Sequence, residues 1–314
     1  MIDGKKFIVF SALIVCMCCI AIVLQSQSRV PQKQKSGKII VVTTLFPLYD
    51  IARQIGGDAV EVKLLLPPGV EAHAFNPTPQ DMMTIESADI FIFTGKFMEP
   101  WVDKVLGSIA NKNIVVVDAS IGTKQINAAS HTAGETEGSI DPHIWLDVDN
   151  MNTMVDSITR AVVAKDPKNS VMIEPKSLEY KAKLAGFDES MKRMIPSCAS
   201  KEIIYGGHYA FGYFATRYGL LYTAAQGLAP DSEPTVQDLT ALVDQIRKEK
   251  IRYVYYEELS SPKVAEVLAS ETGASLLLLN AGHNISKTQL SSGTTFLDIL
   301  QADKQNIQIG LECK

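Results

Sequence analysis

Residues 174–194 read EPKSLEYKAKLAGFDESMKRM and separate two groups of predicted strands. Charged side chains occur at nearly every turn of this segment, which is typical of a long and partly exposed helix. The segment lies within a wider region, Asn150–Ile195, that has helical character and no strand pattern. Because strand patterns occur only before and after this region, we expect a stiff helix that joins two lobes.

Short apolar runs rich in β-branched residues lie on both sides of the predicted helix. Continuous apolar runs of this kind are expected for strands that are buried on both faces of a parallel sheet. The runs before the helix are Ile39–Thr44, Val60–Leu66, Ile90–Thr94 and Ile114–Asp118, and those after it are Ile203–Tyr205, Leu221–Ala224, Tyr253–Tyr256 and Leu276–Leu279.

Helical patterns alternate with these strands. They include Pro47–Ile55, Val102–Ala110, Val236–Glu249 and Pro262–Thr272. The alternation predicts an α/β protein with two lobes, each a mainly parallel sheet flanked by helices, joined by one long rigid helix. The expected divisions are a signal peptide or signal anchor (1–28), a polar tether (29–37), an N-terminal lobe (38–165), the linking helix (166–196) and a C-terminal lobe (197–314).

The first segment, MIDGKKFIVFSALIVCMCCIAIVLQSQS, has the pattern of an export signal. Lys5 and Lys6 precede an uncharged, mostly apolar run, Phe7–Leu24. Such a run is also long enough to remain as a membrane anchor, because about 17–25 apolar residues span a bilayer. Cysteines within the run suggest a lipid anchor, although the residues before them are not the small ones that a lipobox requires. We therefore expect an extracytoplasmic protein, either membrane-associated as a lipoprotein or by a signal anchor, or periplasmic.

The charge balance of the remaining chain is acidic. The protein has 314 residues and a formal net charge of −5, and its first 38 residues are basic. The rest of the chain, residues 39–314, is therefore more acidic than the net charge of the whole chain suggests. An acidic body argues against nucleic acid as a partner and is compatible with a cationic ligand.

Four of the five histidines occupy comparable places in the predicted fold. Each follows the carboxyl end of a predicted strand, which is where open parallel sheets bind ligands. Two belong to each lobe, so a metal site in the cleft between the lobes would bring them together. These candidate ligands are His73, His143, His208 and His283, whereas His131 is interpreted as a structural or solvated residue.

Four sequence blocks strengthen this interpretation: PPGVEAHAFNPTPQD (67–81), DPHIWLD (141–147), GGHYAFGYFATRYGL (206–220) and GLAPDSEPT (227–235). Together they resemble the signature blocks of the zinc/manganese substrate-binding proteins of ABC importers, the cluster A-I family. The resemblance runs in order from about Lys38 to the C-terminus. It implies two α/β lobes joined by one long helix, a metal in the interlobe cleft, and ABC importer permease subunits as partners.

The same resemblance implies that His73, His143 and His208 are the first three ligands. The fourth ligand varies in the family, and LLLLNAGHNIS (276–286) offers His283. Imidazoles suit zinc, whereas carboxylates favour manganese, so we expect tetrahedral Zn²⁺ at about 2.0–2.1 Å, with Mn²⁺ less favoured. The expected function is the capture of Zn²⁺ by a monomer and its delivery to an ABC-type importer. The alternative is a manganese- or iron-binding component of a related importer.

Carboxylates near the predicted ligands are candidates to orient the imidazole rings through their second nitrogen. Ordinary helix caps and surface charges are an equally good interpretation of each one. These residues are Asp141, Asp147, Asp231, Glu233 and Glu257.

Two other functions remain as alternatives. A zinc hydrolase keeps an open coordination position and usually has a general base nearby, but the sequence contains no HExxH motif, and a fourth histidine would fill that position. We therefore expect no enzyme. A surface adhesin is the other alternative, although no adhesive motif is visible. The loop HTAGETEGSI (131–140) holds a single histidine, which argues against the His-rich scavenging loop of many zinc-specific relatives.

Cys198 and Cys313 are the two cysteines outside the N-terminal segment. Outside the cytoplasm they could pair in a disulfide, and two unpaired thiols are the alternative.

Overall fold

The computed structural model describes residues 37–128, 139–228 and 233–314. The fold reported below is that of the unit Ile39–Lys314. The predicted signal segment, almost all of the predicted tether, His131 with most of its loop, and Asp231 lie outside the described residues. In the part of the chain that is described, no helix is long and apolar enough to cross a membrane.

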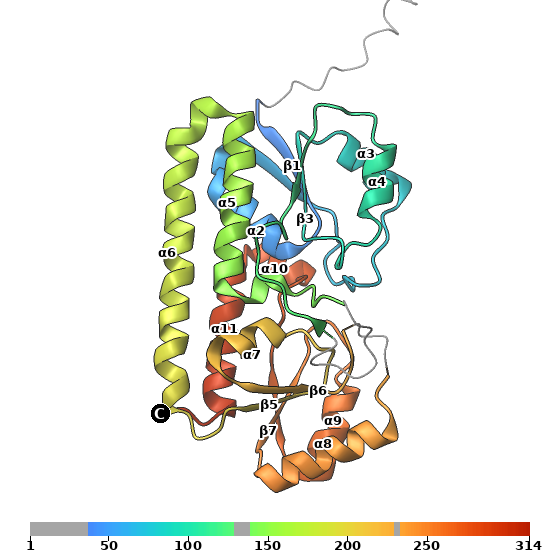
Figure 1. The fold of residues 1–314 in the computed structure, drawn as a ribbon, viewed down its shortest axis with the longest axis vertical. Helices are drawn as coiled ribbons and strands as arrows, with labels where there is room; N and C mark the ends of the chain where they lie inside the picture. Colours follow the sequence, from blue (N-terminus) through green and yellow to red (C-terminus); the bar gives the residue numbers. More distant parts are fainter. Residues whose placement is uncertain (1–36, 129–138, 229–232) are drawn as a thin grey trace, which may run out of the picture. The chain divides into compact units, whose positions relative to one another are not determined.

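The N-terminal sheet consists of four parallel strands in the order β2-β1-β3-β4 (Figure 1). In the middle of the sheet, Val41 of β1 lies between Val62 of β2 and Ile90 of β3. The central strand β3 is buried along its whole length, which explains its continuous apolar sequence. The strand bounds are β1 Ile39–Thr43, β2 Val60–Leu64, β3 Ile90–Phe93 and β4 Val115–Asp118.

The C-terminal sheet repeats this arrangement, with four parallel strands in the order β6-β5-β7-β8. In both sheets the first strand in the chain lies between the second and the third, so the chain winds in opposite directions on its two sides. Ligands bind at the carboxyl ends of the strands at such a switch point. The strands are β5 Glu202–Tyr205, β6 Leu221–Ala224, β7 Tyr253–Tyr256 and β8 Ser275–Leu278. All eight predicted strands are confirmed to within two residues at their ends.

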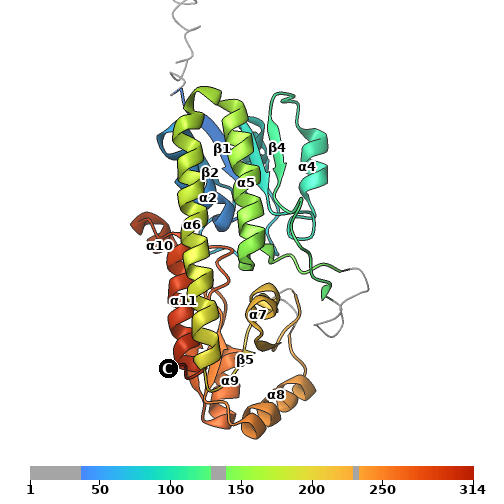
Figure 2. The same ribbon diagram turned by 60° about the vertical axis from the view of Figure 1, so that its left-hand side comes forward.

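Helices surround both sheets, and the predicted long helix is confirmed as one continuous element of 25 residues, α6. It packs against α5, α2 and α11, and Figures 1 and 2 both show it beside α5 in one part of its length and beside α11 in the other. The four predicted helical patterns are confirmed as α2, α4, α8 and α9. The helix bounds are α2 Phe46–Gly56, α3 Pro79–Glu86, α4 Val102–Ser108, α5 Val148–Lys165, α6 Ser170–Met194, α7 Gly212–Tyr218, α8 Val236–Glu249, α9 Lys263–Thr272, α10 Lys287–Ser292 and α11 Phe296–Gly310.

The segment after β8 also connects the two halves of the fold, which the sequence did not indicate. The buried carboxylate of Asp50 on α2 accepts hydrogen bonds from the Phe296 backbone N–H at the start of α11 (3.1 Å) and from the Tyr180 hydroxyl on α6 (3.3 Å). The two halves of the fold are therefore joined by a direct hydrogen bond between α2 and α11 as well as by the linking helix α6. The lobe boundaries at residues 165 and 196 stay a prediction.

Three apolar clusters make up the core. The largest is continuous from the N-terminal sheet through the long helices to the C-terminal sheet, and it includes Phe46, Tyr180, Phe214 and Phe296. The outer face of the N-terminal sheet packs against α3 and α4, and that of the C-terminal sheet against α8 and α9. With both faces covered, the carboxyl edges of the strands are free to present side chains.

Candidate metal centre

The four predicted histidines lie in loops that follow strands of both sheets. His73 follows β2, and His143 directly precedes a 3-10 turn, Ile144–Leu146, that leads into α5. His208 lies between β5 and α7, and His283 lies between β8 and α10. The structure brings all four together, although 65 or more residues separate neighbouring ligands in the chain.

Three of the rings already have a spacing that suits a metal. The Nε2 atom of His143 lies 3.2 Å from Nε2 of His73 and 3.1 Å from Nε2 of His208. A zinc tetrahedron with Zn–N bonds of about 2.0–2.1 Å places its ligand atoms roughly 3.3 Å apart. The rings of His143 and His208 have no exposed surface, and His73 is half-buried.

Buried carboxylates lie beside the Nδ1 atoms of two of the rings. Nδ1 of His143 lies 2.7 Å from Oδ1 of Asp141, and Nδ1 of His208 lies 2.8 Å from Oε1 of Glu257. A carboxylate can only accept, so Nδ1 of His143 carries the proton and its Nε2 is left with a bare lone pair. Nδ1 of His208 is close to Glu257 but makes no hydrogen bond with it. The lone pair of His143 faces Nε2 of His208 at 3.1 Å, a separation at which two unprotonated nitrogens can bind one cation between them.

The local environment keeps these rings neutral, as metal binding requires. Burial lowers the pKa of His73 and that of His143 below the ordinary histidine value, and the neighbouring histidines lower both further. Because protonation would add a buried charge beside other imidazoles, the neutral form is favoured at neutral pH.

His283 has a different environment from the other three. Its ring centroid lies 5.8 Å from that of His208 and 6.4 Å from that of His73. Its Nε2 lies 3.9 Å from Oε2 of Glu71, and it forms a second potential metal-binding group with Glu71 and Glu257. Burial opposes its charged form, but the nearby carboxylates, Glu71 foremost, outweigh burial and raise the pKa of His283.

The predicted orienting carboxylates divide into two groups. Asp141 and Glu257 contact ligand rings, as expected. Asp147 does not, because its side chain caps α5 and pairs with Arg217. Glu233 is exposed and has no contact with a ligand ring among the described residues. Glu71 was not predicted, and its one sequence signal is its position two residues before His73 in the same loop.

Two glycines allow the ligand loops to pack closely. At Gly207, which precedes His208, a Cβ atom would lie 2.7 Å from the Tyr205 ring and 2.8 Å from Oε2 of Glu257. At Gly282, which precedes His283, φ is +69° and a Cβ atom would lie 2.7 Å from the Phe296 ring. Both loops therefore require glycine to place the next residue.

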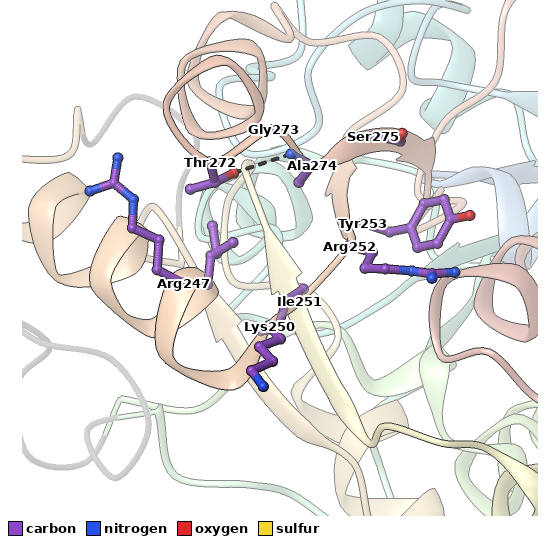
Figure 3. Close-up of a pocket in the computed structure, with 10 residues that line it drawn as sticks. Arg247, Lys250, Ile251, Arg252, Tyr253, Thr272, Gly273, Ala274 and Ser275 are labelled. Carbon is purple, nitrogen blue, oxygen red and sulfur yellow. Dashed lines mark hydrogen bonds between the residues drawn. The ribbon is translucent and has the colours of Figure 1, made fainter.

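A surface pocket of about 480 Å³ lies elsewhere, at the amino ends of β7 and β8 (Figure 3). It is lined by basic side chains that include Arg247, Lys250 and Arg252. Arg247 donates to the Glu271 carbonyl at 2.7 Å, and Arg252 pairs with Glu312. The pocket contains none of the four histidines, and its positive charge does not suit a metal cation.

Comparison with known proteins shows the family of this chain. The family model described as the periplasmic component A of zinc-uptake complexes (ZnuA) matches residues 41–310. The chain belongs to this family. It is 35% identical to the high-affinity zinc uptake system protein ZnuA of Bacillus subtilis over 310 residues, which cover 96% of each chain.

Other members of the family agree with this assignment. The zinc-binding lipoprotein AdcA of Streptococcus pneumoniae is 30% identical over 299 residues, and the match covers 93% of this chain but 58% of AdcA. The crystal structure of the metal-dependent lipoprotein YcdH of Bacillus subtilis superposes with a TM-score of 0.76 at 35% identity, covering 87% of this chain and 99% of the other. The Zn(II)-bound ZnuA-like domain of AdcA from Streptococcus pneumoniae superposes with a TM-score of 0.75 at 28% identity, covering 88% and 100%.

Proposed function

We propose that this protein captures Zn²⁺ outside the cytoplasm and delivers it to the permease subunits of an ABC-type importer. The observation that carries this proposal is the convergence of the Nε2 atoms of His143 and His208, which lie 3.1 Å apart in a buried site. This separation suits two ligands of one tetrahedral zinc ion. Membership of the zinc-uptake family supports zinc as that cation.

In this proposal His73, His143 and His208 form three corners of the zinc tetrahedron, and His283 is the fourth ligand. Four imidazoles suit zinc better than manganese, which prefers carboxylate oxygens. A filled fourth position leaves no place for a reactive water, so the protein acts in transport and not as an enzyme. We further propose that it is a monomer held at the membrane by its N-terminal segment.

Removal of single histidines tests the zinc site in the purified protein. His143→Ala and His208→Ala should each weaken zinc binding by more than the ~10–100-fold that is typical for loss of an outer-shell partner. His283→Ala should weaken it less, because water can take the fourth position. Isothermal titration with zinc gives the affinities, and His131→Ala serves as the control that also removes one imidazole. Unchanged affinity in the His143 and His208 variants would refute the site.

Competition between zinc and manganese tests the alternative, a manganese- or iron-binding component of a related importer. The proposal requires that zinc displace bound manganese at equal concentration, because Zn²⁺ lies above Mn²⁺ in affinity for nitrogen ligands. Preferential retention of manganese would favour the alternative.

A further inference from the structure

The carboxylates beside His283 form a cluster that the three-histidine site does not use. One ligand atom from each of Glu71, Glu257 and His283 lies within 4.8 Å of the other two. Glu257 and His283 are 4% and 5% exposed, so most of this cluster is buried. Two carboxylates this close repel each other unless a cation, either a protonated His283 or a metal ion, lies beside them.

The cluster contains polar atoms that lack partners among the described residues. Nδ1 of His283 and Oε2 of Glu257 are buried without a hydrogen bond. In the same part of the chain, no lysine or arginine forms an ion pair with Glu71 or Glu257, whose close cationic neighbours are histidines. Buried polar atoms without partners are rare and unfavourable, so this arrangement points to a ligand.

The donor set identifies the chemical class of that ligand. Two carboxylates and one imidazole bind divalent cations, and this set is harder than a set of three imidazoles. It therefore accepts Mn²⁺ as well as Zn²⁺, and it holds zinc less tightly than the histidines do.

The cluster adjoins the three-histidine site directly. Oε1 of Glu71 accepts a hydrogen bond from the His73 backbone N–H (3.0 Å), and Oε1 of Glu257 lies 2.8 Å from Nδ1 of His208. The Glu71 side chain is 29% exposed, whereas the rings of His143 and His208 are fully buried. Glu71 and His73 are therefore the members of the two clusters that solvent reaches, and both are accessible to an incoming cation.

We propose that Glu71, Glu257 and His283 form a first capture position, from which a divalent cation passes to the three histidines while His283 remains its ligand. This inference rests on the proposed function and adds a kinetic step to it. One cation occupies the two positions in turn, because they share His283.

Zinc association kinetics test the capture position. In the full-length protein, Glu71→Gln should lower the association rate constant for zinc by about tenfold, because a carboxylate that attracts the cation is lost. The matched control is Glu266→Gln, which removes the same charge from an exposed position on α9 and should change the rate by less than about twofold. Equal rates in the two variants, measured by stopped-flow mixing with a fluorescent zinc competitor, would overturn the proposal.

Manganese binding in a His143→Ala background gives a second and independent test. This variant breaks the three-histidine site but leaves the capture position intact, so it should still bind one Mn²⁺, measured by electron paramagnetic resonance. Adding Glu71→Gln should weaken this residual binding by at least about tenfold, whereas adding Glu266→Gln should not. Residual binding that is insensitive to Glu71→Gln would overturn the capture position. The proposed zinc function fails by a different result, namely wild-type zinc affinity in the His143→Ala variant alone.

Discussion

At the residue scale, buried carboxylates control the chemistry of the histidines. Asp141 holds His143 by two hydrogen bonds, one to its backbone N–H (3.0 Å) and one to Nδ1 (2.7 Å). This double contact fixes both the ring orientation and the tautomer, so that Nε2 points a lone pair at its neighbours.

Replacement of this carboxylate should weaken zinc binding without removing a ligand. We expect Asp141→Asn to lower zinc affinity by about 10–100-fold, because an amide stabilises the ligand tautomer less well than a carboxylate does. Isothermal titration of zinc measures the effect. Asp103→Asn is the control, since it makes the same change on an exposed residue of α4. Equal affinity in both variants would contradict the orienting role of Asp141.

Another buried carboxyl, Glu99, lies outside the metal site and affects stability. Its side chain accepts hydrogen bonds from the Thr44 hydroxyl and from the backbone N–H groups of Thr94 and Gly95. Burial nevertheless outweighs these hydrogen bonds and raises the pKa of Glu99 from 4.5 to about 7. The folded state therefore binds a proton more tightly than the unfolded state does.

This raised pKa predicts a pH dependence of the free energy of unfolding. The stabilisation from the proton is fully present below pH ~4.5 and is lost as the pH rises through about 7. It amounts to about 3 kcal/mol at most, from ~1.4 kcal/mol per pKa unit. The difference in stability between the wild type and Glu99→Gln should therefore change by up to this amount between pH 5 and pH 8.5 in urea unfolding. Parallel pH profiles of the two proteins would show that Glu99 does not titrate as expected.

At the element scale, Arg217 connects three helices near the ligand loops. From α7 it donates to Asp188 on α6 at 2.6 and 2.8 Å. The same guanidinium donates to Asp147 and Asp149 at the start of α5, at 2.8–3.2 Å. Because α5 follows His143 and α7 follows His208, this ion-pair cluster fixes the positions of the two ligand-bearing segments relative to each other.

Loss of the guanidinium should destabilise the protein substantially. Arg217→Met leaves Asp188, whose side chain is 7% exposed, without its main cationic partner, and we expect a loss of about 3 kcal/mol in the free energy of unfolding. Asp149→Asn should cost less than ~1 kcal/mol, because that carboxylate is 78% exposed. Urea unfolding at neutral pH distinguishes the two. A small effect in Arg217→Met would mean that Lys192 and Tyr218, which also contact Asp188, compensate fully.

At the scale of the whole molecule, the C-terminus is tied to the end of the long helix. Cys198 and Cys313 form a disulfide with a sequence separation of 115, which confirms the pairing that the sequence left open. Backbone hydrogen bonds from Ala199 to Glu312 and from Ser200 to Leu311 run beside it. The covalent loop encloses the entire C-terminal sheet together with α11.

Removal of this bridge should lower the free energy of unfolding and leave the fold intact. A loop of this length corresponds to about 4–5 kcal/mol in the chain-entropy model, because the bridge restricts the unfolded chain. The Cys198→Ser/Cys313→Ser variant should therefore unfold at lower urea concentration with unchanged circular dichroism. Free thiols at both positions, found by peptide mapping of non-reduced protein, would contradict the pairing in solution.

Local sequence patterns were enough to predict the helices and strands of this protein and the identity of its candidate ligands. Eight strands and the long α6 helix were predictable because continuous apolar runs and helical charge patterns are local properties. Four histidines were predictable because each follows a strand, and the carboxyl edges of parallel strands converge on ligand sites. The resemblance of the blocks around His73, His143 and His208 to a known family implied zinc or manganese, and the imidazole ligands favoured zinc.

The way in which these residues meet depends on the folded chain. Glu71 was missed, and Asp147 stood equally as an orienting carboxylate or a helix cap, because local sequence does not tell which carboxylates face a ligand ring. Contacts such as Asp50 with the start of α11 join residues 246 positions apart, so no periodicity can reveal them. The separation of His283 from the other three rings, and its place beside Glu71 and Glu257, likewise results from packing between distant loops. Distances, burial and tautomers depend on the whole fold, because each is determined by neighbours that the chain brings together only when it folds.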